Sequence, residues 1–138
     1  MIKVKQIITG VMAAATIATT VLSLNVNAAG NYTDTGYSFK VSTSSKYTDF
    51  REKLDDTSAS IKVTSGDYVI ARVYGKTGIL GGKADCTYGI PKTVGVSSTY
   101  TFLPNTVYED GYSYACLGLT SASGTSFTSA GVWSPDSV

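Results

Sequence analysis

Residues 58–74 read Ser58-Ala59-Ser60-Ile61-Lys62-Val63-Thr64-Ser65-Gly66-Asp67-Tyr68-Val69-Ile70-Ala71-Arg72-Val73-Tyr74, and they contain two strand patterns separated by a turn. Over residues 58–64, apolar and polar residues alternate, which is typical of a half-buried β-strand. Over residues 68–74 both faces are apolar apart from Arg72, which predicts a central strand. The Ser-Gly-Asp triplet between them supplies the residue types that turns require.

The same period of two recurs along the rest of the chain. Turn residues such as Gly81-Gly82, Pro104-Asn105, Asp110-Gly111 and Ser123-Gly124 separate the runs. Strands at this spacing, without a long helical pattern, predict an all-β fold, namely a single antiparallel β-sandwich or jelly-roll-like domain. The further predicted strands cover residues 37–41, 94–102, 112–119 and 127–133.

The N-terminal segment has the pattern of a secretory signal peptide. Lys3 and Lys5 precede an uncharged, mostly apolar run over residues 7–24, and Ala28 and Ala29 fit a cleavage site. We therefore predict a signal peptide over residues 1–28 and a secreted β-sandwich domain over residues 29–138. The alternative is a membrane anchor, because about eighteen residues approach the lower limit for spanning a bilayer.

Charge argues against a nucleic-acid partner. The chain has 11 Lys and Arg against 10 Asp and Glu, and removal of Lys3 and Lys5 would change the formal charge from +1 to about −1. Binding to a phosphate backbone relies on clustered cations. Here the cations are spread singly and are predicted to be solvated: Lys40, Lys46, Arg51, Lys53, Lys62, Arg72, Lys76, Lys83 and Lys92.

The sequence contains no histidine. Histidine is the usual general base near neutral pH and the commonest metal ligand. Its absence excludes Ser-His-Asp and Cys-His hydrolysis, so we expect a protein that is not an enzyme, without a cofactor and without a metal site.

Two cysteines, Cys86 and Cys116, follow the predicted signal peptide. Thiols of exported proteins meet oxidising conditions and tend to pair, so we predict one disulfide between them. It would close a loop of about 30 residues, and the chain-entropy model credits such a loop with about 3–4 kcal/mol. The alternatives are two free thiols, or a metal site, which two cysteines without histidine disfavour.

Tyrosine provides the first candidate binding residues. The chain has ten tyrosines, and four crowd around one predicted turn. Tyr112 and Tyr114 fall on one face of a predicted strand, opposite the apolar residues at 115, 117 and 119, and an outward row of rings would suit stacking on sugars or anchoring a protein partner. The alternative is half-buried packing, since tyrosine is a good strand former. The candidates are Tyr100, Tyr108, Tyr112 and Tyr114.

Carboxylates provide the second set of candidates. Asp55-Asp56 and Glu109-Asp110 are adjacent pairs, and a glycosidase needs two carboxyl groups about 5–10 Å apart. Neighbours in a strand point to opposite faces, so a surface or turn role is favoured. A calcium site is disfavoured because no loop has the alternating acidic pattern of such sites; the possible oxygen ligands would be Asp49, Asp55, Asp56 and Asp67.

Several short stretches carry a resemblance to a known family. They are Tyr37-Ser38-Phe39, Tyr47 to Arg51, Thr57-Ser58-Ala59, Gly111-Tyr112 and the distinctive ending Gly131-Val132-Trp133-Ser134-Pro135-Asp136-Ser137. Through them the chain resembles an uncharacterised family of small secreted Gram-positive proteins, filed as a domain of unknown function. The resemblance implies a signal peptide and a compact extracellular β domain, and it brings no catalytic residues.

Within that ending, Trp133 is the sole tryptophan and is followed by a proline two residues later. Proline ends a strand ladder. We therefore expect Trp133 to act as a structural anchor that closes the core and ties down the C-terminus; the alternative is an exposed ring in a ligand platform.

Two classes of function fit these observations best. The first is a secreted, extracellular and non-catalytic protein that binds a glycan or a protein at a cell surface. The second is a secreted polysaccharide hydrolase that uses Asp and Glu as acid and base, because that chemistry can dispense with histidine. A small bacteriocin-like toxin is a third possibility. No nucleic acid, and no membrane after signal cleavage, is expected as a partner.

Overall fold

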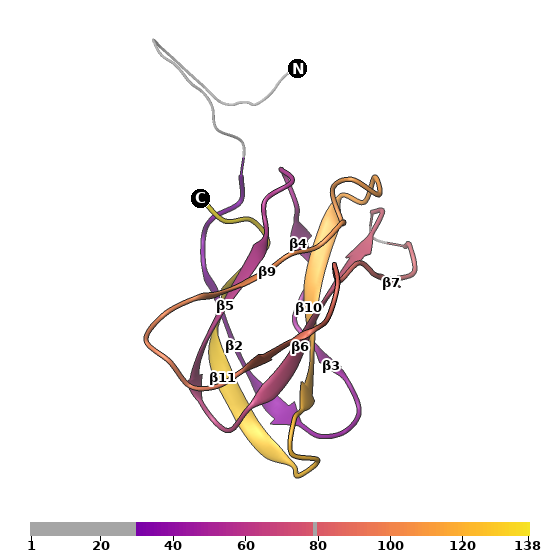
Figure 1. The fold of residues 1–138 in the computed structure, drawn as a ribbon. Helices are drawn as coiled ribbons and strands as arrows, with labels where there is room; N and C mark the ends of the chain where they lie inside the picture. Colours follow the sequence, from indigo (N-terminus) through magenta and orange to yellow (C-terminus); the bar gives the residue numbers. More distant parts are fainter. Residues whose placement is uncertain (1–29, 79) are drawn as a thin grey trace.

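A computed structural model describes residues 30–78 and 80–138. These residues contain strands and no helix, arranged as two antiparallel sheets packed face to face (Figure 1). The predicted all-β sandwich is therefore confirmed, whereas the predicted signal peptide lies outside the described residues. Among those residues, no helix is long and apolar enough to cross a membrane.

The first sheet has four strands in the order β2-β11-β5-β9. β11 lies in the centre and pairs with β2 on one side and with β5 on the other. Since β2 pairs only with β11, it forms an open edge of this sheet. The strands are β2 (Thr35–Val41), β5 (Ala59–Ser65), β9 (Thr101–Leu103) and β11 (Phe127–Ser134).

The second sheet is built on a central pair, β6 and β10, which are antiparallel over eight residues. Two short strands, β3 and β4, share the outer side of β10, and two more, β7 and β8, share the outer side of β6. Each outer edge is thus one interrupted strand. The bounds are β3 (Lys46–Tyr47), β4 (Arg51–Glu52), β6 (Val69–Lys76), β7 (Ala84–Asp85), β8 (Lys92–Val94) and β10 (Tyr114–Ser121).

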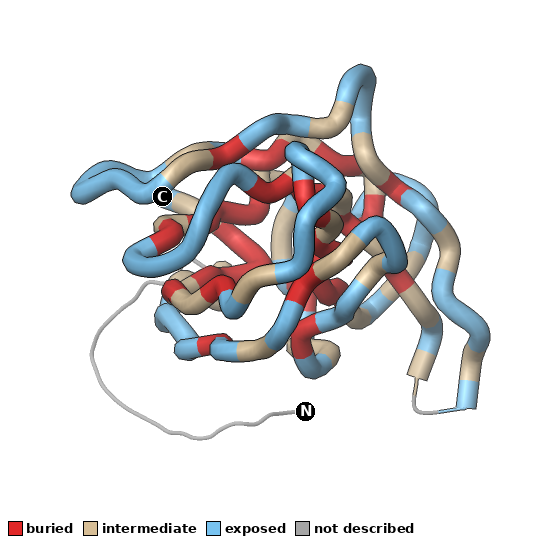
Figure 2. Tube along the Cα trace, turned by 90° about the horizontal axis from the view of Figure 1, so that it is seen from below, coloured by how far each residue is buried: buried red, intermediate tan, exposed pale blue. Residues whose placement is uncertain are grey.

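The core lies between the two sheets, where the buried segments gather in Figure 2. Every second residue of the long strands points into it, as the alternation predicts. β5 and β6 belong to different sheets, so the turn at residues 66–68 carries the chain from one layer to the other. The buried hydrophobic residues include Val41, Ala59, Ile61, Val63, Val69, Ala71, Val73, Ala115, Leu117, Leu119 and Trp133.

Two threonines interrupt the outer edges of the second sheet in the same way. The N–H of Leu117 donates to the hydroxyl of Thr48 at 2.9 Å, and the N–H of Val73 donates to the hydroxyl of Thr87 at 2.9 Å. In each case a side-chain oxygen replaces the backbone acceptor of a continuous ladder. At Thr48 the pairing with β10 shifts by one residue between β3 and β4, as in a β-bulge, whereas after Thr87 the chain leaves β6 and bridges to Asn105.

The predicted strand over residues 94–102 is wrong in its middle. β8 ends at Val94 and β9 starts at Thr101, with a loop between them. Val96, Tyr100 and Phe102, which the alternation assigned to a buried face, are 41–55% exposed. Within residues 94–103, Val94 and Leu103 face the core. The alternating sequence pattern therefore continues into a loop in which strand pairing has stopped.

The predicted disulfide is also wrong: Cys86 and Cys116 are two free, buried thiols. Cys116 pairs with Tyr74 on β6, whereas the register of β7 places Cys86 beside Val73, which pairs with Leu117. Paired residues point to the same face, so the two cysteines lie on opposite faces of the sheet. β6 also separates them, and two strand spacings of about 9–10 Å exceed the reach of a disulfide.

Two of the cations predicted to be solvated are not. Lys53 is buried, with 3% of its surface exposed, and its Nζ lies 2.5 Å from Asp136 Oδ1. Arg51 is half-buried and donates to the carbonyl oxygen of Trp133 at 3.2 Å. Both side chains reach acceptors more than 80 residues away, which the local sequence does not reveal.

Candidate functional site

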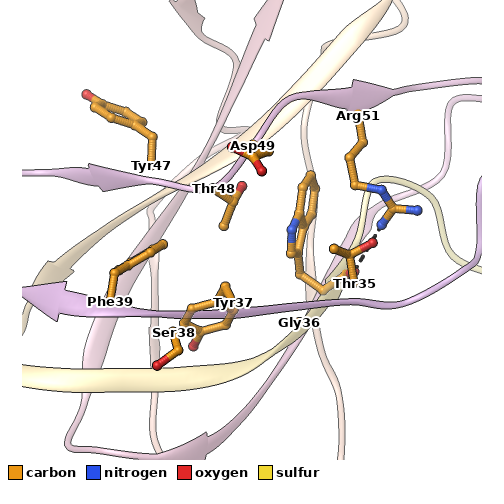
Figure 3. Close-up of a pocket in the computed structure, with 10 residues that line it drawn as sticks. Thr35, Gly36, Tyr37, Ser38, Phe39, Tyr47, Thr48, Asp49 and Arg51 are labelled. Atoms are coloured by element: carbon orange, nitrogen blue, oxygen red, sulfur yellow. Dashed lines mark hydrogen bonds between the residues drawn. The ribbon is translucent and has the colours of Figure 1, made fainter.

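A cleft of about 470 Å³ opens between the two edge strands of the sandwich, where β2 of one sheet faces the β3 and β4 segments of the other. Its volume falls in the range of small-ligand sites, about 300–1,000 Å³. Figure 3 shows residues from both strands facing each other across this hollow. The lining residues are Thr35, Gly36, Tyr37, Ser38, Phe39, Tyr47, Thr48, Asp49, Arg51 and Trp133.

Aromatic rings form the apolar wall of the cleft. Tyr37 and Phe39 occupy alternate positions of β2 and therefore lie on the same face, with ring centroids 5.2 Å apart and a tilt of 38°. The hydroxyl groups of Tyr37 and Ser129 are 3.0 Å apart in the core, which fixes the Tyr37 ring. Phe39 is only partly buried and offers ring surface to the cleft.

Charged side chains lie on the opposite strand. Asp49 is exposed, whereas the Arg51 guanidinium lies 5.5 Å from the Trp133 ring centroid and donates to the Asn31 side-chain oxygen at 3.1 Å. Burial lowers the pKa of Arg51, and the charges of Asp34 and Asp136 oppose that shift. A guanidinium remains protonated in proteins, so Arg51 keeps its positive charge in the cleft.

Thr48 positions the carboxylate of Asp49, the next residue in the chain. Its side chain accepts from the Leu117 N–H, and its own N–H donates to the Leu117 carbonyl oxygen at 3.0 Å. Both ends of one residue are thus held on β10 immediately before Asp49. The interrupted edge strand consequently presents Asp49 and Arg51 on the same border of the cleft.

The rim of the cleft continues onto the outer face of the second sheet. Tyr47 meets Tyr74 edge to face with centroids 5.2 Å apart, and Lys83 Nζ lies 4.2 Å from the Tyr47 ring centroid. Gly118 makes this possible, because a Cβ there would come within 2.6 Å of the Tyr74 ring. Two tyrosine rings and a cation therefore cover the sheet beside the cleft.

The four tyrosines predicted from sequence do not lie in this cleft. Tyr100 is 41% exposed in the loop before β9, where its hydroxyl donates to Asp34 and Lys62 Nζ lies 4.9 Å from its ring centroid. The hollow beside Tyr100 is lined by Tyr32 and residues of the C-terminal segment, and the other three tyrosines do not line it.

The structure brings Tyr108 and Tyr112 together in a different hollow, next to Glu52 and Leu54. Tyr108 is 50% exposed, whereas Tyr112 packs partly against the core. Tyr114 is half-buried and begins β10, two residues later than predicted. A binding role for the four tyrosines remains a prediction, and they do not form one continuous row.

The two carboxylate pairs are each divided between environments. Asp55 is held by the N–H and hydroxyl of Thr57, whereas Asp56 and Glu109 line one hollow together with Tyr88 and Asn105. One carboxylate from each pair therefore contributes to the same surface depression. Within residues 30–78 and 80–138, no group of three or more His, Cys, Asp or Glu side chains is arranged to hold a metal ion.

Trp133 lies at the floor of the cleft and in the hydrophobic core, with 1% of its surface exposed. Its place at the end of β11 precedes Pro135 and Asp136, which are also buried. This burial favours the expected structural role over an exposed ring in a ligand platform.

Phe39 and Arg51 are not among the sequence-predicted site residues, and Asp49 is among them only as a possible ligand of the disfavoured calcium site. Phe39 follows the alternation of a core strand, and Arg51 is one of the cations predicted to be solvated. Their role depends on the packing of two sheet edges, which no local pattern reports. In the sequence, the site is indicated only by the mainly polar and charged run at residues 48–53.

The fold and the cleft together define an all-β sandwich domain with a ligand-sized hollow at its open edge. The chain belongs to the family described as protein of unknown function (DUF2712), whose model matches residues 24–137. The predicted membership of an uncharacterised family is thereby confirmed. No curated protein and no solved structure gives a significant match.

Proposed function

We propose that the protein is an exported, non-catalytic domain that binds a glycan at a cell surface through the edge cleft. One observation carries this proposal: a ligand-sized hollow combines the rings of Tyr37 and Phe39 with Asp49 and Arg51. Export rests on the predicted signal peptide, and the lack of histidine argues against most hydrolytic mechanisms.

The chemistry of the lining suits a sugar. A sugar ring has an apolar C–H face that packs on aromatic rings, and hydroxyl groups that both donate and accept hydrogen bonds. Asp49 offers only acceptors and Arg51 offers only donors, so together they can hold neighbouring hydroxyl groups in one orientation. The described hydrogen bonds of the Arg51 guanidinium use two of its five N–H groups.

The test is retention on purified, insoluble cell walls, using the protein as its cells produce it. Asp49→Asn keeps the size of the side chain and removes its charge. A hydrogen bond to a charged group contributes about 1.5–3 kcal/mol, so the affinity of this variant should fall about 10- to 100-fold. Protease treatment of the walls should leave binding of the parent protein unchanged.

Glu109→Gln is the matched control, because it makes the same chemical change on the far hollow and should retain full binding. Equal retention of Asp49→Asn and the parent protein would rule out the cleft as the site. Loss of binding after protease treatment would identify a protein partner instead of a glycan.

A polysaccharide hydrolase is the second candidate, and one observation favours it: Asp56 and Glu109 line the same hollow. Two carboxyl groups across a depression are what glycoside hydrolysis requires. Soluble reducing sugar, assayed in the same tubes, separates the candidates. A hydrolase would release sugar and lose that activity in Glu109→Gln, whereas the binding proposal predicts retention without release.

A further inference from the structure

A buried amine and a buried carboxyl group meet at the end of the sandwich. The side chains of Lys53 and Asp136 are both 0% exposed, and Lys53 Nζ lies 2.5 Å from Asp136 Oδ1. Charges removed from water are costly even when paired. Transfer of one proton from the ammonium group to the carboxylate would leave a neutral amine and a neutral acid, which tolerate burial better. A neutral lysine amine is also a nucleophile.

The carboxyl group of Asp136 is polarised on its other oxygen. Oδ2 accepts from the backbone N–H of Asn31 at 2.6 Å and from that of Leu54 at 3.0 Å. Two backbone donors on one carbonyl oxygen are the arrangement that stabilises the oxyanion of acyl-transfer reactions. Oδ1 faces Lys53 and accepts from neither of these two N–H groups. It is therefore the oxygen that would leave.

A third group is placed to move protons. Asp55 Oδ1 lies 4.0 Å from Lys53 Nζ, and Thr57 holds that carboxylate through its N–H at 3.0 Å and through its hydroxyl. The carbonyl oxygen of Thr57 also accepts from Lys53 Nζ at 2.5 Å. The amine is therefore fixed between an acceptor and the carboxyl group that it would attack.

We propose that Lys53 and Asp136 condense spontaneously into an intramolecular isopeptide bond, with Asp55 as the proton relay. The neutral Nζ attacks Asp136 Cγ, and the negative charge of the tetrahedral intermediate develops on Oδ2 between its two N–H donors. Asp55 takes a proton from the nitrogen and passes it to Oδ1, which leaves as water. An amide forms, one water is lost and no redox partner is needed.

The product matches the surrounding hydrogen-bond partners. The amide keeps one N–H, for which the Thr57 carbonyl oxygen is already in place, and Oδ2 becomes the amide oxygen with its two donors. The bond would join the end of β4 to the segment after β11 across 83 residues. It would supply the covalent closure that the two separated cysteines cannot form.

Intact-mass spectrometry of the protein as isolated tests the proposal. Relative to the sequence that remains after N-terminal processing, the parent should be lighter by one water molecule, and a tryptic digest should contain a branched peptide joining Lys53 to Asp136. Lys53→Arg should have its full mass. A folded parent protein of full mass, with Lys53 and Asp136 in separate linear peptides, would overturn the proposal.

Asp55→Asn tests the relay while keeping both reacting groups. We expect this variant to lose the water at least tenfold more slowly than the parent protein after synthesis, whereas Asp67→Asn, on an exposed turn, should condense at the parent rate. If Asp55→Asn condenses at the parent rate, Asp55 is not the relay.

Discussion

Cys116 lies on the outer face of the second sheet, where it is buried and carries a free thiol. Burial raises the pKa of its thiol to about 12, and the nearby charges of Lys83 and Lys76 only partly oppose this. Burial likewise raises the pKa of Cys86, with the charge of Asp110 adding to the effect. The thiolate is the reactive form, so both thiols should be nearly inert at pH 8 in the folded protein.

Thiol labelling checks this at the level of the residue. Without reductant, a thiol-specific reagent at pH 8 should label almost nothing in the native protein and two cysteines per chain once the protein is denatured. No free thiol in the denatured, unreduced protein would show that the two cysteines are linked after all.

Trp133 contributes to stability through burial and through its backbone. It is 1% exposed and its carbonyl oxygen accepts from Arg51. Replacing a buried tryptophan with alanine typically costs about 3–5 kcal/mol. Trp133→Ala should therefore shift the midpoint of urea unfolding strongly downward, while an unchanged midpoint would remove its role as a structural anchor.

At the level of the element, the interrupted edge strand holds the polar side of the cleft. Thr48→Val keeps the shape of the side chain but leaves the buried N–H of Leu117 without its acceptor. An unsatisfied buried donor costs about 1–3 kcal/mol, and urea unfolding should show this loss. Thr128→Val, at an exposed position of β11, is the control and should be nearly neutral. Equal effects of the two substitutions would deny Thr48 its positioning role.

Alternation predicts most of the elements correctly, because the predicted strands at residues 37–41, 58–64, 68–74, 112–119 and 127–133 are paired over most of their length. It fails where pairing stops without a change in pattern, as at Val96 and Tyr100. The candidate site was harder to predict, since Asp49 and Arg51 acquire their place from two sheet edges that meet only in the folded chain. The disulfide prediction is wrong for a related reason. An oxidising extracellular compartment favours a disulfide, but the strand register places Cys86 and Cys116 on opposite faces of the sheet.

At the level of the whole molecule, the two ends of the described chain are tied together. Asn31 and Asp136 exchange backbone and side-chain hydrogen bonds, and Figure 1 shows the C-terminus beside the start of the described residues. Asp136 also binds Lys53 and Leu54, which brings the edge of one sheet to the last strand of the other. This end of the sandwich is therefore closed, while the β2 edge is open and forms the cleft.

Acid should loosen the closed end. Burial pushes the pKa of Asp55 upward, but hydrogen bonds with Thr57, Asp136 and Tyr32 outweigh it, and its pKa lies below the ordinary value. A depressed carboxyl pKa stabilises the fold above the pKa of the unfolded chain, about 4, and that contribution is lost as the pH falls further. The melting temperature should drop below about pH 4.

Asp55→Asn provides the comparison for this pH dependence. It removes the titrating group, so its melting temperature should start lower at pH 7 and change less on acidification than that of the parent protein. Parallel pH profiles for the two proteins would show that Asp55 does not contribute.

The location of the binding site is tested most directly by NMR titration of the isotope-labelled protein with soluble fragments of purified wall polysaccharide. The account predicts that the amide shifts of Thr35, Phe39, Asp49 and Arg51 move with fragment concentration while those of Tyr100 and Tyr108 stay in place. Shifts confined to the predicted tyrosines or to the hollow at Asp56 and Glu109, with the cleft unchanged, would contradict it.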